Sequence, residues 1–323
     1  MNILGLNIFH ADTSACLIID GKIVSAVEEE RFTRIKHYAG FPINSIKFCL
    51  ESSKLSLHNI DYIALNFNSR YNFFEKLRYS LFTNPISLIK KLSLSYKKNS
   101  IRRILDKNFL SKFSGKIVYV PHHLSHVASS YLCSGLESAI GLSIDGSGDF
   151  STSETYLCEK EKITLLDKVN YPHSLGIFYQ AFTQFLGFTN YGDEYKVMGL
   201  ASYGRPVYAD KILKNVISYN KKKFKLNLKY FTHHTSEFSY YFENGIPVFE
   251  NLFSNKITNL FGSPREINAP ITKFHQDLAA SIQYVFEEIV ISIVKNIYKK
   301  YNPENLVLSG GCIFNSVLNG KLE

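Results

Sequence analysis

The sequence lacks long apolar runs, a leader-like start and paired cysteines. No stretch of ~18 uncharged apolar residues occurs, although a transmembrane helix requires one. Residues 1–5 carry none of the basic side chains with which a signal peptide begins. The cysteines follow no Cys-x-x-Cys spacing and are scattered at Cys16, Cys49, Cys133, Cys158 and Cys312. This usage is typical of reduced thiols, so we expect a cytoplasmic protein with no membrane partner.

Acidic residues are fewer than basic ones. Lysine and arginine number 37 against 28 aspartates and glutamates, which gives a formal net charge of +9. Basic clusters occur at residues 90–91, 97–98, 102–103 and 221–223. A nucleic-acid-binding surface is one interpretation, but aromatic residues are not interleaved with these charges as base stacking would require. Solvated faces are therefore favoured over nucleic acid as a partner, and such a basic surface attracts phosphorylated substrates.

Two similar hairpin patterns occur about 135 residues apart in the sequence, and they indicate a duplicated α/β fold. The first has apolar runs at 2–9, 14–19 and 22–28, with Asp20-Gly21 as a hairpin turn. Its first loop carries Asp12 and Ser14, which either face an anion or serve as turn residues. The second pattern joins strands 139–145 and 152–158 through a loop at 145–150. We expect two lobes in this chain of 323 residues, with a phosphate-sized cleft between the loops.

A histidine-rich stretch follows a predicted strand at 116–120. If Pro121 opens a helix, His122 and His126 lie one turn apart on the same face. Leu124, Ala128, Tyr131 and Leu132 would then form the inward, apolar side. Two imidazoles at this spacing can hold one metal ion, to which Asp145 at a strand end adds a carboxylate. Two histidines and one carboxylate suit Fe(II), with zinc as the alternative, whereas ordinary helix-end contacts are the simpler interpretation.

The remaining segments are assigned more coarsely. Helices are expected at 42–51, over much of 70–113, from residue 172 to about 186, and at 276–299. Residues 205–265 have the character of an insertion that shapes substrate choice. A strand at 305–308 is followed by Gly310-Gly311, and this pattern allows close backbone approach to a nucleotide or phosphate.

Together these motifs resemble the carbamoyltransferases of the nodulation and antibiotic-biosynthesis type. The N-terminal part of that family is similar to the tRNA-threonylcarbamoylation protein of the actin/Hsp70/sugar-kinase superfamily. The matching segments occur in family order and lie at residues 5–15, 28–36, 41–42, 122–126, 145–149, 174–179, 194–204 and 309–315. The resemblance implies an actin-like (ribonuclease H-like) α/β fold of two lobes, with a first lobe at 1–138 and a second at 139–323.

The resemblance also implies a reaction and a set of site residues. Carbamoyl phosphate and ATP would form carbamoyl adenylate, whose carbamoyl group passes to a hydroxyl of a sugar or natural product. His10 would lie near the transferred group, Lys36 would neutralise anionic charge there, and a divalent metal would be held by His122, His126 and Asp145. His123 would be a neighbour rather than a ligand. The residues expected to bind the nucleotide are Asp12, Ser14, Gly146, Gly148, Lys196, Gly310, Gly311 and Asn315.

The sequence departs from the family pattern at two places. Ala11 separates the loop histidine from Asp12, and the chain stops before a late Asp-Gly segment and a C-terminal adenylate-forming domain. We therefore expect an incomplete second lobe, and a separate polypeptide that supplies the remainder is one explanation. The alternatives are a tRNA-threonylcarbamoylation protein and a non-catalytic remnant that binds a nucleotide or a partner.

Overall fold

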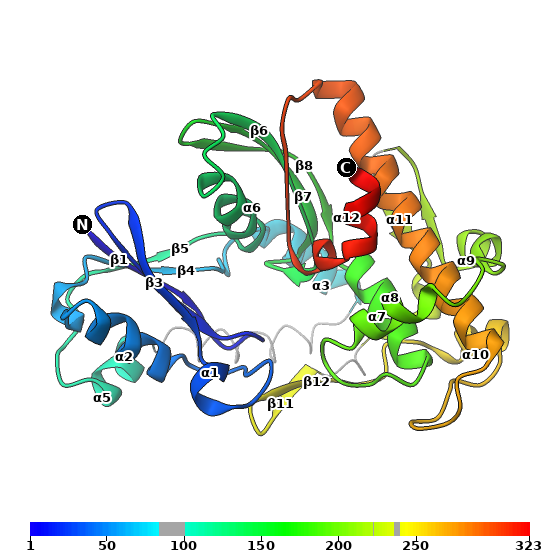
Figure 1. Ribbon diagram of the computed structural model, residues 1–323, viewed down its shortest axis with the longest axis horizontal. Helices are drawn as coiled ribbons and strands as arrows, with labels where there is room; N and C mark the ends of the chain where they lie inside the picture. Colours follow the sequence, from blue (N-terminus) through cyan, green and yellow to red (C-terminus); the bar gives the residue numbers. More distant parts are fainter. Residues whose placement is uncertain (84–100, 222, 236–239) are drawn as a thin grey trace. The chain divides into compact units, whose positions relative to one another are not determined.

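The computed structural model describes residues 1–83, 101–221, 223–235 and 240–323 (Figure 1). The chain forms two compact units: Met1–His122 with Tyr240–Phe249, and His123–Ser239 with Glu250–Glu323. The division falls after His122, the first residue of helix α6 (His122–Leu132). The helix backbone therefore connects His122 directly to the second unit. The predicted lobe boundary at 138/139 stays a prediction. The basic pairs at 90–91 and 97–98 lie outside the described residues.

The first unit contains a five-stranded sheet in the order β3-β2-β1-β4-β5. Its strands are β1 (Asn2–Asn7), β2 (Ser14–Ile19), β3 (Lys22–Glu28), β4 (Tyr62–Leu65) and β5 (Lys116–Tyr119). β1, β2 and β3 pair antiparallel, whereas β4 and β5 continue the sheet in parallel. Asp20 and Gly21 both have positive φ, which confirms the predicted hairpin turn because such turns need left-handed residues.

The first unit also contains helices and short elements. They are α1 (Glu30–Thr33), α2 (Ile43–Ser52), η1 (Leu57–Asn59), α3 (Phe73–Thr83), α5 (Ile101–Asn108) and the hairpin β11 (Tyr240–Glu243)–β12 (Ile246–Phe249). Of these, α1 and α2 contact strands of this sheet. Alternating strand residues and the apolar side of α2 bury a common core that includes Leu4, Ile46 and Ile63. The excursion predicted at 70–113 is described only in α3, α5 and the residues that flank them.

The second unit repeats the strand order of the first. Its sheet runs β13-β6-β7-β8, with strands β6 (Ser138–Gly148), β7 (Ser151–Glu159), β8 (Lys162–Asn170) and β13 (Leu306–Ser309). β6, β7 and β8 pair antiparallel and β13 pairs parallel with β6, as β4 does with β1. Among the described residues, this sheet has no counterpart of β5. The repeated order confirms the predicted duplicated, actin-like α/β fold.

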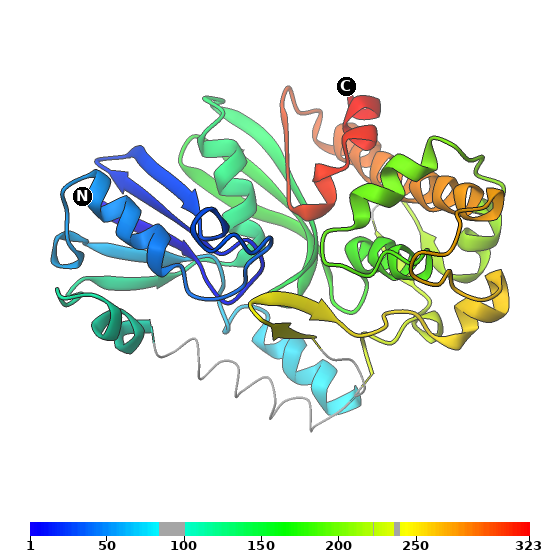
Figure 2. The same ribbon diagram turned by 60° about the horizontal axis from the view of Figure 1, so that its bottom comes forward.

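Helices of the second unit pack around this sheet and around one another. They are α6 (His122–Leu132), α7 (Leu175–Phe185), α8 (Glu194–Ala201), α9 (Ala209–Asn215), α10 (Asn255–Phe261), α11 (Lys273–Tyr301) and α12 (Ser316–Leu322). The short elements are β9 (Ile217–Tyr219), β10 (Phe224–Leu226), η2 (Leu228–Tyr230) and η3 (Gly311–Phe314). Figure 2 shows the long helix α11 in orange along the green helices α7 and α8, with which it packs.

Two expectations need correction, and one strand is additional. Residues 145–150 are not a free loop, because β6 continues to Gly148 and only Asp149 and Phe150 form the turn, both with positive φ. Strand β8 was not anticipated. Leu132 is 60% exposed rather than inward, and buried Val127 and Tyr131 form the apolar side of α6. No helix among the described residues has the length and apolarity needed to cross a membrane.

Candidate metal centre

Helix α6 places His122 and His126 on one side of its first turns. Val127 and Tyr131 anchor the helix because their side chains are buried in an apolar cluster with β6, β7 and β13. The four-residue spacing then stacks the two imidazoles one turn apart. His122 is 7% exposed, whereas His126 is partly open to solvent, with about a third of its side chain exposed (32%).

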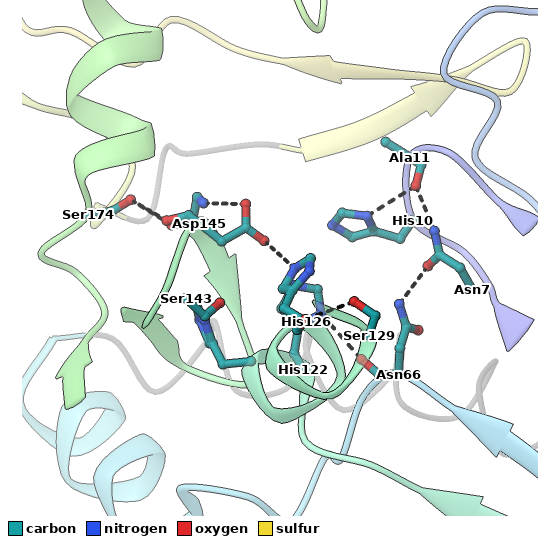
Figure 3. A network of polar contacts seen from close by, with 12 residues as sticks. Asn7, His10, Ala11, Asn66, His122, His126, Ser129, Ser143, Asp145 and Ser174 are labelled. Carbon is teal, nitrogen blue, oxygen red and sulfur yellow. Dashed lines mark hydrogen bonds and ion pairs between the residues drawn. The ribbon is translucent and has the colours of Figure 1, made fainter. Parts of the chain in front are cut away.

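Strand β6 supplies the carboxylate of Asp145. The β6–β7 register shifts between Ile144 and Gly148, and a bulge of this kind redirects the side chains next to it. Asp145 Oδ1 accepts a hydrogen bond from the Gly146 amide at 2.8 Å, and its Oδ2 lies 3.3 Å from His126 Nε2 (Figure 3). The bulge therefore turns the predicted carboxylate toward the helix that carries both histidines.

His122, His126 and Asp145 form a set that fits a divalent metal. One ligand atom from each residue lies within 4.8 Å of the other two. Ligands about 2.1 Å from a common ion lie roughly 3.0–4.2 Å apart, so small side-chain adjustments close the set around one ion. Two imidazoles and one carboxylate are the ligands that iron and zinc accept.

A backbone contact orients the first imidazole. His122 Nδ1 lies 3.2 Å from the carbonyl oxygen of Asn66, which accepts its proton. This contact selects the tautomer in which Nε2 carries the lone pair, as outer contacts of metal-bound histidines usually do. Asn66 in turn donates to Asn7 Oδ1 at 3.1 Å, which ties the ends of β4 and β1 together (Figure 3).

The loop between β1 and β2 holds His10 beside His122. Asn7 Nδ2 donates to the carbonyls of Ala11 and Asp12, each at 2.9 Å, and Thr13 Oγ1 donates to the His10 carbonyl. The rings of His10 and His122 have centroids 5.9 Å apart. His10 Nδ1 lies 3.3 Å from the Ala11 carbonyl oxygen. The loop histidine therefore lies beside the first imidazole of the candidate ligand set.

Asp12, Ser14 and Lys36 occupy different surroundings in the first unit. Asp12 has φ +59°, and its Oδ1 accepts a 2.8 Å hydrogen bond from His37 Nδ1. This hydrogen bond raises the pKa of His37. Ser14 begins β2 and Lys36 is exposed. The carboxylate of Asp12 is thus already engaged by an imidazole.

The glycines of the second unit allow elements to approach closely. Gly310 follows β13 with φ +90°, and an added Cβ would lie 2.4 Å from the carbonyl oxygen of Ile144. A Cβ on Gly311 would lie 3.0 Å from Asp145 Oδ1. Gly146 faces Gly176, whose added Cβ would lie 2.7 Å from its Cα. The Gly-Gly pair therefore lets the end of β13 pack beside β6, the strand that carries Asp145.

Asn315 and Lys196 are held by partners within the protein. Asn315 Oδ1 caps α12 by accepting from the Leu318 amide at 3.0 Å, and its carboxamide exchanges two 2.9 Å hydrogen bonds with Gln283. Lys196 Nζ lies 2.7 Å from Asp193 Oδ1. His123 is hydrogen-bonded to Ser143 and lies outside the metal-ligand set. Roles of Gly146, Gly148, Gly310, Gly311, Asn315 and Lys196 in nucleotide binding stay predictions.

The burial of several carboxylates was not predicted from the sequence, among them Glu29, Glu154 and Glu287. Glu29 is 2% exposed and accepts four hydrogen bonds of 2.7–3.0 Å from Asn44 and Ser45 at the start of α2. Glu287 is 3% exposed and contacts Gln283 and Lys321. The charged residues around Glu29 gave no indication that this side chain is buried. The burial of Glu287 could have been predicted, because apolar residues flank it on the amphipathic helix α11.

Comparison with known proteins identifies the class. A family model described as "Carbamoyltransferase N-terminus" matches residues 2–323. The "Uncharacterized protein sll1178" of Synechocystis sp. is 35% identical over 333 residues, which covers 99% of this chain and 52% of the relative. "Nodulation protein NolNO" of Sinorhizobium fredii is 32% identical over 323 residues, with coverages of 98% and 42%.

The chain belongs to the carbamoyltransferase family, matching the family's N-terminal region. It spans about half the length of the curated relatives it matches. Similar solved structures include component A of the Acidaminococcus fermentans (R)-2-hydroxyglutaryl-CoA dehydratase, at 13% identity and TM-score 0.48 over 100% of this chain and 88% of that one. Another is full-length HypF, at 14% identity and TM-score 0.43 over 99% and 50%.

Proposed function

We propose that this region transfers a carbamoyl group from carbamoyl adenylate, made from carbamoyl phosphate and ATP, to a hydroxyl of a sugar or natural product. The observation that carries the proposal is the ligand set His122, His126 and Asp145 in a member of the carbamoyltransferase family. These residues would hold a divalent metal, with Fe(II) favoured and zinc the alternative. When bound, the ion supplies Lewis-acid polarisation of the carbamoyl carbonyl.

His10 is proposed as the general base of the transfer step. Donation from Nδ1 to the Ala11 carbonyl leaves Nε2 as the basic nitrogen, which accepts the proton of the attacking hydroxyl. The hydroxyl oxygen forms a bond to the carbamoyl carbon while the bond from that carbon to the phosphate oxygen breaks. AMP leaves with the electron pair, and exposed Lys36 neutralises anionic charge of the donor.

The backbone around Gly146, Gly148 and Gly310-Gly311 is proposed to hold the nucleotide. Glycines allow phosphate or ribose oxygens to approach backbone amides closely. The carboxamide of Asn315 is occupied by the cap of α12 and by two hydrogen bonds with Gln283. Through these hydrogen bonds Asn315 holds this loop in place. Its replacement would therefore loosen the loop and not only remove a ligand contact.

The test supplies labelled carbamoyl phosphate, ATP, Fe(II) and a panel of hydroxyl acceptors. The chain is assayed alone and within a longer polypeptide that spans the full length of its relatives. We expect carbamoylated acceptor with stoichiometric AMP from the longer polypeptide. An intact, folded protein that consumes no carbamoyl phosphate with any acceptor would refute the proposal.

Asp145→Asn tests the metal centre directly. The change keeps the side-chain shape but removes an anionic ligand, so zinc affinity of the chain should fall by about tenfold or more. Asp167→Asn is the matched control, because Asp167 lies on β8 in a surface ion pair with Lys223. Equal zinc affinity in both variants would place the metal elsewhere.

A further inference from the structure

The second unit contains a cavity whose lining includes none of the residues proposed above to bind the metal or to act in the transfer step. It has a volume of about 340 Å³ and is lined by the segment between α7 and α8, the first turn of α8, and residues 265–271 ahead of α11. Small-molecule sites start at about 300 Å³, and this size suits a ligand comparable to a phosphorylated monosaccharide.

Arg265 places a fixed positive charge in this cavity. Its guanidinium donates to the carbonyls of Leu186 and Ala269 at 2.6 Å and of Gly187 at 3.4 Å, and it lies 4.9 Å from the Phe188 ring centroid. These acceptors are neutral, and no carboxylate of the described ranges forms an ion pair with Arg265. The guanidinium charge is therefore held in place without being neutralised.

Lys196 adds a second cationic group, an ammonium, to the cavity. Its hydrogen bond with Asp193 at 2.7 Å raises the pKa of Lys196, so the amine stays protonated near neutral pH. Counting Arg265 and Lys196 as positive and Asp193 as negative leaves one net positive charge among the lining residues. The cavity thus favours an anionic ligand over a neutral one.

The rest of the lining matches a hydroxylated ring. Asn190 and Asn268 contribute carboxamides that can donate to and accept from hydroxyls. Phe188 and Ile267 contribute apolar surface, and Ile267 is 63% exposed. A sugar ring presents both hydroxyls and apolar C–H faces, whereas inorganic phosphate would use only the cationic part of this lining.

Helices α7 and α8 connect the cavity with the strand that carries Asp145. Lys196, in the first turn of α8, lines the cavity. Helix α8 packs against α7, and α7 packs against β6. Ser174, the N-cap residue of α7, donates to the carbonyls of Asp145 and Gly146. Helix α7 therefore links the end of β6 to the cavity, whose lining begins just after the C-terminal end of α7.

We propose that this cavity binds the acceptor, and that the acceptor is an anionic, hydroxyl-rich molecule of monosaccharide size, such as a sugar phosphate or sugar carboxylate. That this ligand is the acceptor rests on the proposed carbamoyl transfer. The binding itself does not, because charge and lining chemistry define the ligand class independently of the reaction.

The experiment measures binding by calorimetry to the chain without donor or metal. Glucose 6-phosphate and glucuronate are the probes, with glucose, inorganic phosphate and AMP as comparisons. We expect the two sugar anions to bind about tenfold more tightly than glucose or phosphate, because one charge-assisted contact and the ring contacts act together. Failure of both anions to bind, or stronger binding of AMP at the same residues, would overturn the proposal.

Asn268→Gly is the informative variant. Asn268 has φ +70°, so glycine keeps the backbone conformation while it removes the carboxamide. We expect about fivefold weaker binding of glucose 6-phosphate with unchanged unfolding. Lys299→Gln, at an exposed lysine near the end of α11, is the matched control. Equal affinity in both variants refutes this site, whereas intact binding with no carbamoylated product refutes the proposed function alone.

Discussion

Replacement of Gly310 by alanine separates a packing role from a ligand-binding role. Gly310 has φ +90°, a conformation that side chains other than glycine rarely adopt. An alanine Cβ would lie 2.4 Å from the Ile144 carbonyl oxygen and 2.9 Å from the carbonyl carbon of the same residue. Both are backbone atoms, so β13 and β6 would have to move apart to accept the methyl group.

The magnitude follows from two terms. Holding alanine in this backbone region costs about 1–3 kcal/mol, and the overlap adds about 1–3 kcal/mol of overpacking. We therefore expect Gly310→Ala to lower the free energy of unfolding by about 2–6 kcal/mol, against a typical total of about 5–15 kcal/mol. Because Ile144 precedes Asp145, the same shift should weaken zinc binding by about tenfold.

Urea unfolding followed by circular dichroism measures the first effect, and zinc titration measures the second. Gly320→Ala is the control, because Gly320 lies in α12 and an added Cβ meets no atom within 4 Å. That change should be neutral or stabilising by up to about 1 kcal/mol, since alanine favours helix. If Gly310→Ala unfolds within about 1 kcal/mol of the parent protein and binds zinc equally well, the packing argument is wrong.

Three further predictions follow from buried or paired ionisable groups. Glu29→Gln should lower the free energy of unfolding by on the order of 3 kcal/mol in urea titrations, because an amide replaces one carboxylate oxygen and leaves donors at the start of α2 without acceptors; an unchanged midpoint would contradict this role of the Glu29 carboxylate. Asp12→Asn should lower the pKa of His37 toward 6.5 in a proton NMR titration, since the Asp12 hydrogen bond raises it; the stabilisation from this pair is full below pH 6.5 and is lost as pH rises through the pKa of His37 in the folded protein. His173 and His233 have pKa values lowered to about 4, chiefly by burial, so their contribution to stability is complete above pH 6.5 and is lost as pH falls toward 4; for the more deeply buried His233 the loss at pH 5 should be roughly 2 kcal/mol, and a proton NMR titration in which His233 is half-protonated near pH 6.5 would refute this.

Local patterns were sufficient to predict much of the fold. Asp20-Gly21 sets a tight hairpin because both residues tolerate positive φ, and the structure has them so. The spacing of His122 and His126 puts both imidazoles on one side of a helix whatever that helix packs against. The repeated hairpin pattern predicted a duplication, and both sheets show it. The hairpin turn and the histidine spacing depend only on backbone geometry within a few residues of the chain.

Long-range packing decided the rest of the candidate site. A register shift in β6 turns Asp145 toward His126, and no sequence period reveals such a bulge. The burial of Glu29 depends on the position of α2, which lies well over ten residues further along the chain. Arg265 reaches the loop after α7 across nearly 80 residues of sequence. Contacts between segments so distant in sequence are set by how helices and strands pack, so only the tertiary structure shows them.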